Sequence, residues 1–178
     1  MKNSSLRGAL AALAACTAAS AGAQQHVEMN AIDIKGVGAP IGTVLIMPAP
    51  QGGVLFTPDL KGLPPGEHGF HVHEFPNCGA REKDGQMSAG ELAGNHYDPK
   101  KTGKHAGPQG EGHLGDLPPL KVDAEGNAKQ ALVAPRLAVK DLSGKSLVIH
   151  GGGDNGSDQP KPNGGGGTRI ACGVIGEK

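Results

Sequence analysis

Two histidines stand two residues apart inside an otherwise apolar segment. The stretch GFHVHEF places His71 and His73 around Val72, directly after Phe70. In a β-strand residues i and i+2 point to the same face, so the two imidazoles share one face and the two apolar side chains share the other. The apolar face can fill a core, while the imidazoles look outward together, close enough to hold one metal ion. The spacing therefore predicts a metal site on a strand.

A second apolar segment, SLVIH, follows the same pattern. Leu147 and Ile149 are expected on one face of a strand, and Val148 and His150 on the other. A lone histidine in such a place would be a structural residue with satisfied hydrogen bonds. The His-x-His pair elsewhere in the chain favours metal binding over that alternative.

Three more histidines and an aspartate lie in a glycine-rich part of the chain. The motifs GNHYDP, GKHAGP and GHLGDLP contain His96, His105, His113 and Asp116. Three nitrogens and one oxygen suit a four-coordinate zinc ion with no open position, as in structural zinc sites. Neighbouring glycines let the backbone bend as the ligand geometry requires. Any one of these histidines could be a solvated loop residue, but so many in such contexts indicate metal binding.

The elements that must position these residues are short antiparallel strands. Apolar segments bounded by Gly or Pro are typical of such strands. We expect about eight, at residues 26–34, 41–47, 52–60, 68–73, 120–122, 128–134, 146–150 and 169–175. Residues 117–135 are predicted to form a hairpin around the turn DAEGN. The predicted fold is all-β, an eight-stranded antiparallel Greek-key barrel or sandwich.

Two long segments do not fit this strand pattern. Residues 74–116 have no steady period, and residues 151–168 consist mainly of Gly, Asp, Asn, Pro and Ser. Loops this long are uncommon in compact domains and are usually functional or disordered. Because the first contains three histidines and the second lies between two strands, we expect two functional loops.

Length and charge exclude several kinds of partner. The chain has 178 residues, enough for one domain, and its 17 basic and 17 acidic residues give a net charge of zero. This balance gives no electrostatic case for binding nucleic acid or an anionic membrane. Few exposed aromatic residues are available to mark an interface, and the oligomeric state stays open between a monomer and a homodimer.

The N-terminus is typical of an export signal. A basic start, the apolar segment GALAALAA and the small-residue stretch AGA predict a signal peptide at residues 1–23, followed by one domain at residues 24–178. The alternative is a lipoprotein signal at residues 1–15, ending in LAAC, which would leave Cys16 as a lipid anchor. The apolar segment is too short for a stable membrane span. Both alternatives predict export, and we expect a periplasmic protein.

The cysteine count fits that location. Of three cysteines, Cys16 is removed or lipidated, which leaves Cys78 and Cys172 as an even pair in an oxidising compartment. A disulfide between them would close a very long loop.

Several motifs of the chain together resemble one known family. GFHVHE, GNHYDP, HAGP, GHLGDLP, LVIHGGGDN and GGGGTRIACGVI occur in this order. They resemble the copper,zinc superoxide dismutases, specifically the exported bacterial branch, over essentially all of residues 26–176. The resemblance implies a sandwich fold, one copper and one zinc ion per subunit, and dismutation of superoxide to oxygen and hydrogen peroxide.

The resemblance also implies roles for individual residues. The copper ligands would be His71, His73, His96 and His150. The zinc ligands would be His96, His105, His113 and Asp116, with His96 bridging the two metals as a histidinate. Asp154 would accept hydrogen bonds from His71 and His105, Arg169 would lie beside copper, and Cys78 and Cys172 would form the intrachain disulfide.

Elementary chemistry is consistent with these implied roles. Imidazole ligands tolerate both oxidation states of copper, and zinc, which has no redox chemistry, can act as a fixed clamp. A bridging His96 can leave copper on reduction, take a proton and later supply it to the nascent peroxide. Arg169 is a permanent cation with a rigid donor fork, able to hold superoxide and stabilise developing charge.

Two other functions compete with superoxide dismutation. A periplasmic copper and zinc store or chaperone could use the same fold, and loss of Arg169, His96 or a copper ligand would favour it, but none is missing. A zinc hydrolase needs an open zinc position and a nearby base, whereas the expected zinc set is closed. The residues therefore favour the dismutase.

Four further residues carry expectations. Arg81 and Lys83, in AREKDG, are expected to help guide superoxide. His68 is expected on the surface, without a role. If cleavage follows Ala23, the new amine, two amides and His26 would form a square-planar copper chelate, which lipidation at Cys16 would abolish.

Overall fold

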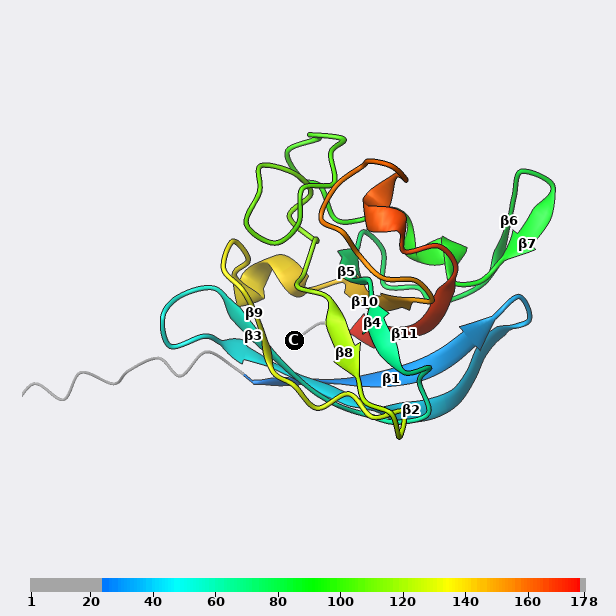
Figure 1. Cartoon of the computed structure of the whole chain (residues 1–178), viewed down its shortest axis with the longest axis horizontal. Helices are drawn as coiled ribbons and strands as arrows, with labels where there is room; N and C mark the ends of the chain where they lie inside the picture. Colours follow the sequence, from blue (N-terminus) through cyan, green and yellow to red (C-terminus); the bar gives the residue numbers. More distant parts are fainter. Residues whose placement is uncertain (1–23, 177–178) are drawn as a thin grey trace, which may run out of the picture.

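The computed structural model describes residues 24–176, which form a β-protein with two long loops at one end (Figure 1). The strands are β1 (Gln25–Asp33), β2 (Gly36–Pro48), β3 (Val54–Leu60), β4 (Gly66–His68), β5 (Phe70–His73), β6 (Arg81–Lys83), β7 (Gln86–Ser88), β8 (Leu120–Val122), β9 (Leu132–Ala134), β10 (Lys145–His150) and β11 (Arg169–Ile175). Three short 3-10 helices are η1 (Glu91–Ala93), η2 (Val139–Leu142) and η3 (Asn163–Gly165). The predicted signal segment and Cys16 lie outside the described residues. Within residues 24–176, no helix is long and apolar enough to span a membrane.

Seven strands form one curled antiparallel sheet in the order β5-β10-β11-β1-β2-β3-β9. Two smaller sheets pair β4 with β8 and β6 with β7. The all-β prediction is confirmed. The described residues contain more strands than the eight expected because Gly69 separates β4 from β5 and because the first long loop forms the β6–β7 hairpin.

Alternation along the strands builds the core. Val27 and Met29 of β1 are buried in alternation with more exposed residues, and Ile32 departs from that alternation. The departure is a β-bulge, since the register between β1 and β2 shifts between Asn30 and Ile32. Ile32 consequently packs in a second apolar cluster rather than in the main core.

The predicted hairpin over residues 117–135 is wrong. Its turn exists, with the Gly126 amide donating to the Asp123 carbonyl over 3.1 Å. The flanking strands nevertheless pair with other partners, β8 with β4 and β9 with β3. Strand alternation and turn residues identify each strand, but partner choice depends on how the sheet curls, which no local pattern encodes.

A disulfide joins the first long loop to the barrel. Cys78 in the loop is bonded to Cys172 in β11, across 94 residues of sequence. Both cysteines pack with Ile32, Ala93 and Val148 in the second apolar cluster. The disulfide predicted from the even cysteine pair is confirmed. Covalent bond and packing together hold Cys78 and Ala93 against Val148 of β10 and Cys172 of β11.

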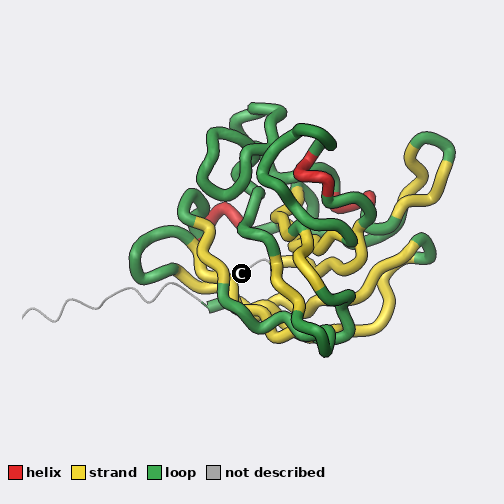
Figure 2. Tube along the Cα trace, in the orientation of Figure 1, coloured by secondary structure: helices red, strands yellow, loops and turns green. Residues whose placement is uncertain are grey.

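The two long loops gather over one end of the strands. Figure 2 shows this region as mostly loop, with strands below it. The Asp158 carboxylate accepts hydrogen bonds from the backbone amides of His105 (2.9 Å) and Asn163 (3.0 Å), which ties the second loop to the first. Both loops are thus parts of one structure, in which most of the predicted site residues lie.

Candidate metal centre

The alternation predicted for the His-x-His segment is confirmed, but its histidines are not exposed. Phe70 and Val72 lie in the main core cluster, and His71 and His73 point away from it. Both imidazoles are nevertheless fully buried. The first long loop covers them, with the Val72 amide donating to the Gly115 carbonyl over 2.9 Å and His73 lying opposite His96 in an isolated bridge.

The sheet register brings the other strand residues to the same place. Strand β10 runs antiparallel to β5 on one side and β11 on the other, and His150 lies opposite Arg169 after a register shift. Cross-strand partners share a face of the sheet. His150 and Arg169 therefore both reach the space beneath the loops.

Two groups of buried side chains place their ligand atoms within 4.8 Å of one another. The first contains His71, His73, His96 and His150. The second contains His71, His96, His105 and Asp116. The rings of His71 and His96 are stacked, with centroids 3.9 Å apart, so the two groups adjoin at this pair.

Backbone carbonyls determine which nitrogen each strand histidine offers. A carbonyl oxygen only accepts, so the Nδ1–H of His73 donates to Gly94 (3.0 Å) and the Nδ1–H of His150 donates to Gly167 (3.2 Å). Each Nε2 then carries a lone pair, and the two Nε2 atoms lie only 3.4 Å apart. Facing lone pairs repel unless a cation lies between them. The first group therefore fits a cation.

The second group converges on one carboxylate. The Nδ1 atoms of His96, His105 and His113 lie 2.9, 3.1 and 3.3 Å from oxygens of Asp116. The Nδ1 atoms of His105 and His113, like that of His71 in the first group, are buried and make no hydrogen bond. Buried polar atoms are rarely left without a partner, so these nitrogens also fit a metal ion.

The second group differs in one member from the zinc set expected from the sequence. It includes His71 where His113 was expected. His71 comes close because its ring stacks on His96, but its Nε2–H is engaged by Asp154. His113 has an unpaired Nδ1 directed at Asp116 and so remains the better fourth donor.

Asp154 accepts hydrogen bonds from two of these histidines, each through its Nε2. Its Oδ2 accepts from Nε2 of His71 over 2.7 Å, and its Oδ1 accepts from Nε2 of His105 over 2.8 Å. These bonds fix both tautomers and direct each Nδ1 toward its group. Outer carboxylates of this kind orient metal-binding histidines and increase their basicity.

The electrostatics of the site separate the two groups. Burial, reinforced by the neighbouring His71, lowers the pKa of His96 to about 3. Burial likewise holds the pKa of His73 and of His150 well below its usual value. Burial would also lower the pKa of His105, but the carboxylates of Asp116 and Asp154, one beside each ring nitrogen, outweigh it and raise that pKa to about 9. The first group favours neutral imidazoles, and the second has a negative centre that attracts a cation.

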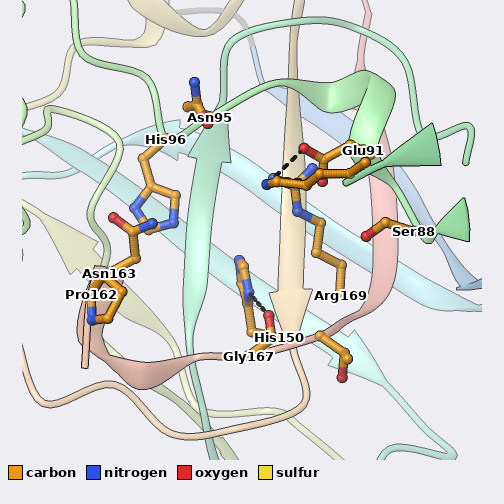
Figure 3. A pocket seen from close by; sticks show the side chains of 11 residues that line it. Ser88, Glu91, Asn95, His96, His150, Pro162, Asn163, Gly167 and Arg169 are labelled. Carbon is orange, nitrogen blue, oxygen red and sulfur yellow. Dashed lines mark hydrogen bonds and ion pairs between the residues drawn. The ribbon is translucent and has the colours of Figure 1, made fainter. Parts of the chain in front are cut away.

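A pocket of about 260 Å³ opens onto the first group. His96 and His150 line it together with Arg169, Lys83 and Glu91 (Figure 3). Arg169 is held by two carbonyls, Nη1 donating to Gly90 over 2.6 Å and Nη2 to Gly94 over 2.7 Å. Its remaining N–H groups are available to an anion in the pocket.

Glu91 was not identified from the sequence. This buried carboxylate lies 2.9 Å from Lys83 and 3.7 Å from Arg169, so one anion contacts both cations of the pocket. It lies in η1, within a segment without periodicity, and no local motif distinguishes it. Only the folding of the loop brings it beside Arg169.

The prediction that His68 lies on the surface is wrong. Its side chain is buried, and its ring nitrogens lie 2.7 Å from the His150 carbonyl and 2.8 Å from the Pro64 carbonyl. These polar partners offset the cost of burial. In a continuous strand His68 would share the inward face of Phe70 and Val72, so the expectation of a surface position rested only on the absence of a role.

Comparison with known sequences identifies the family. A family model described as copper/zinc superoxide dismutase (SODC) matches residues 41–175. Superoxide dismutase [Cu-Zn] 2 of Salmonella typhimurium (strain LT2) is 55% identical over 176 residues, which cover 98% of this chain and 99% of that protein. Superoxide dismutase [Cu-Zn] of Escherichia coli (strain K12) is 54% identical over the same length and shares.

Solved structures show the same relationship. The Cu/Zn superoxide dismutase from Brucella abortus matches with a TM-score of 0.84 at 48% identity, over 86% of this chain and 99% of that one. The monomeric copper, zinc superoxide dismutase from Salmonella enterica matches with a TM-score of 0.77 at 57% identity, over the same shares. With its converging histidines and near full-length similarity to these enzymes, the chain belongs to the copper/zinc superoxide dismutase family, in its bacterial form.

Proposed function

We propose that the two side-chain groups hold the two metals of this superoxide dismutase. Copper would be held by His71 Nδ1, His73 Nε2, His150 Nε2 and the remaining nitrogen of His96. Zinc would be held by Nδ1 of His96, His105 and His113 and by Asp116. The observation that carries this assignment is the set of buried nitrogens that face one another or a carboxylate without a hydrogen donor between them.

As a member of the family, the chain dismutates superoxide, with one copper and one zinc ion as cofactors. Two superoxide anions and two protons give one oxygen and one hydrogen peroxide, because one anion loses an electron and the other gains it. When bound, copper supplies the one-electron redox cycle and zinc supplies a fixed positive charge. The protein must bind the anion, orient it and deliver protons.

Arg169 would bind and orient superoxide. It lies in the pocket beside His150, and two carbonyls fix its guanidinium, so it is in place before the anion arrives. A fixed cation directed at developing negative charge stabilises a transition state more than a mobile one does. His96 would hold and give up a proton at Nε2, since its Nδ1 faces Asp116.

Lys83 would guide the anion toward Arg169. Its amino group is half exposed and lines the pocket. Arg81 of the same hairpin is not among the residues that line this pocket, so we assign the guiding role to Lys83. Clefts lined by one sign of charge raise the rate at which the opposite charge arrives.

A copper and zinc store on the same fold is the less favoured alternative. A store needs ligands, but it has no use for a cation fixed beside the copper group in an open pocket. Arg169 is such a cation and is part of the pocket wall.

The decisive experiment loads the metal-free chain with copper and zinc and measures metal content and superoxide dismutation together. One copper and one zinc per chain with rapid turnover is expected. His73→Ala should lose copper selectively and His113→Ala zinc selectively, whereas Glu28→Gln, which alters an exposed residue of β1, should keep both. Both metals bound without turnover would indicate a store, and no selectivity would refute the assignment.

We also propose that residues 1–23 are a cleaved export signal, so that the protein acts in the periplasm. We further propose that it is a monomer. A disulfide, as between Cys78 and Cys172, is favoured by an oxidising compartment. The structurally similar Salmonella enterica enzyme is described as monomeric. Mass spectrometry of the exported protein distinguishes cleavage after Ala23 from lipidation at Cys16, and analytical ultracentrifugation gives the oligomeric state.

A further inference from the structure

A second pocket reaches the proposed zinc site from the other side of His96. It has a volume of about 380 Å³, and both His96 and His113 line it. Asn95, His96 and Asn163 line this pocket and the pocket of Arg169 alike. In Figure 3, Asn95 and Asn163 lie on either side of the His96 ring. These three residues thus form the partition between two adjacent openings.

The two pockets carry opposite charge. The first is lined by two cations, Lys83 and Arg169, and one anion, Glu91, which gives a net charge of +1. The second is lined by two anions, Glu74 and Asp98, and one cation, Lys101, which gives −1. The first charge suits the superoxide anion, whereas the second suits a divalent cation.

Asp98 lines this second pocket and has one carboxylate oxygen without a hydrogen-bond partner. Its Oδ2 accepts hydrogen bonds from the Thr102 hydroxyl (3.1 Å) and the Gly103 amide (2.8 Å). Its Oδ1 is buried and has no hydrogen-bond partner. Glu74 is held similarly, because its Oε2 accepts from the backbone amide of Asn95 over 2.8 Å. A carboxylate oxygen without a donor is a suitable transient ligand for a metal ion. His113, whose Nδ1 is also unpaired, lines the same pocket.

We propose that zinc enters and leaves through this second pocket, drawn in by Glu74 and Asp98, while superoxide uses the first. The inference rests on the proposed zinc ligands. With a separate entrance for zinc, the net positive charge of the first pocket does not hinder loading of the zinc site. Opposite charges at two separate openings let one small protein attract an anion and a dication at the same time.

The test follows the rate at which the metal-free, disulfide-bonded chain takes Zn²⁺ from a fluorescent zinc indicator in a stopped-flow instrument. Asp98→Asn and Glu74→Gln should each slow uptake about 3- to 10-fold at low salt, and added salt should reduce the difference. Lys101→Gln should speed uptake, because it removes the only cation of the pocket wall. Glu91→Gln makes the same charge change in the first pocket and is the matched control, with a smaller effect expected.

The outcomes distinguish the proposed entry route from the zinc-ligand assignment on which it rests. Uptake of one zinc per chain at the same rate in Asp98→Asn, Glu74→Gln and their double variant would overturn the entry route and leave the zinc ligands in place. Equal slowing in Glu91→Gln would also overturn it, since the effect would then reflect total charge. Unchanged zinc binding in Asp116→Asn would instead refute the zinc site itself.

Discussion

Glu91 Oε1 lies 2.9 Å from Lys83 Nζ, so the side chain that would guide superoxide is held by a buried carboxylate. The same carboxylate lies 3.7 Å from Arg169. One anion therefore orders both cations of the pocket and cancels half of their charge. Ordering favours productive binding, whereas cancellation weakens attraction of the substrate.

Replacing Glu91 with Gln should separate these effects. The pocket charge would rise from +1 to +2, while the Gly90 and Gly94 carbonyls would still hold Arg169. We expect kcat/KM for superoxide to rise about two- to threefold at low ionic strength, with the gain shrinking as salt is added. Pulse radiolysis over a salt series measures this. Glu67→Gln, on exposed β4, is the control, and a lower rate in Glu91→Gln would mean that ordering Lys83 matters more than charge.

Arg169→Lys should reduce activity although it keeps the charge. The guanidinium spans the Gly90 and Gly94 carbonyls with separate nitrogens, and an ammonium group cannot do this while also reaching the substrate. We expect kcat/KM to fall about tenfold in Arg169→Lys and about 100-fold in Arg169→Ala, in line with the loss of one fixed donor to developing charge. Copper and zinc content, measured on the same samples, should not change. A lysine variant with full activity would show that charge alone suffices.

Much of the site could be predicted from local patterns. Alternation placed Phe70 and Val72 in the core and the histidines beside them on the opposite face, and it separated Leu147 from His150 in the same way. Such predictions succeed because a strand's two faces follow directly from its sequence. Which loop covers a face does not follow from the sequence of the strand. The burial of His71 and His73 under the first long loop was therefore not predicted.

The remaining features depend on contacts between distant segments. Glu91 meets Arg169 across 78 positions of sequence only because the disulfide loop folds back on β11. His68 is buried with one ring nitrogen against the carbonyl of His150, which lies 82 positions away in the sequence. The pattern of a single segment cannot predict contacts between distant segments. The strand partners of β8 and β9 could not be predicted for the same reason.

Asp154→Asn should weaken both metal sites at once. Asp154 accepts from His71, a proposed copper ligand, and from His105, a proposed zinc ligand. An amide offers one acceptor oxygen where the carboxylate offers two, so one histidine loses its orienting bond and the other loses a charged partner. We expect affinity for each metal to fall about 10- to 100-fold. Chelator competition with metal analysis measures this against Asp59→Asn, an exposed control, and loss of only one metal would contradict the bridging role.

Removing the disulfide should destabilise the protein and impair the pocket. The bond closes a loop of 94 residues, for which chain-entropy models give about 4–5 kcal/mol of stabilisation. Cys78→Ala combined with Cys172→Ala should therefore lower the free energy of unfolding by up to this amount in urea titrations. Cys172 is three positions from Arg169, so activity at saturating metal should fall as well. The wild-type chain treated with reductant is the matched comparison, and an unchanged unfolding midpoint would contradict the prediction.

Stability of the metal-free chain should fall as the pH drops below about 6.5. In the folded state burial, with the neighbouring His71, lowers the pKa of His96 from 6.5 to about 3, and burial acts in the same direction on His73 and His150. Between these pH values the unfolded state binds a proton at His96 that the folded state excludes, so this histidine lowers the free energy of unfolding by up to about 1.4 kcal/mol per pH unit. His73 and His150 act in the same direction.

His105 does not oppose this loss in the same range. Its pKa is raised from 6.5 to about 9, so the stability that it contributes is lost as the pH rises toward 9 and is fully present below 6.5. Urea midpoints of the metal-free chain should therefore decline steadily from about pH 6.5 to pH 4.5. The chain loaded with both metals should resist until protons displace them, because ligated nitrogens cannot be protonated. A metal-free midpoint that stays constant over this range would mean that the buried histidines accept protons in the folded state.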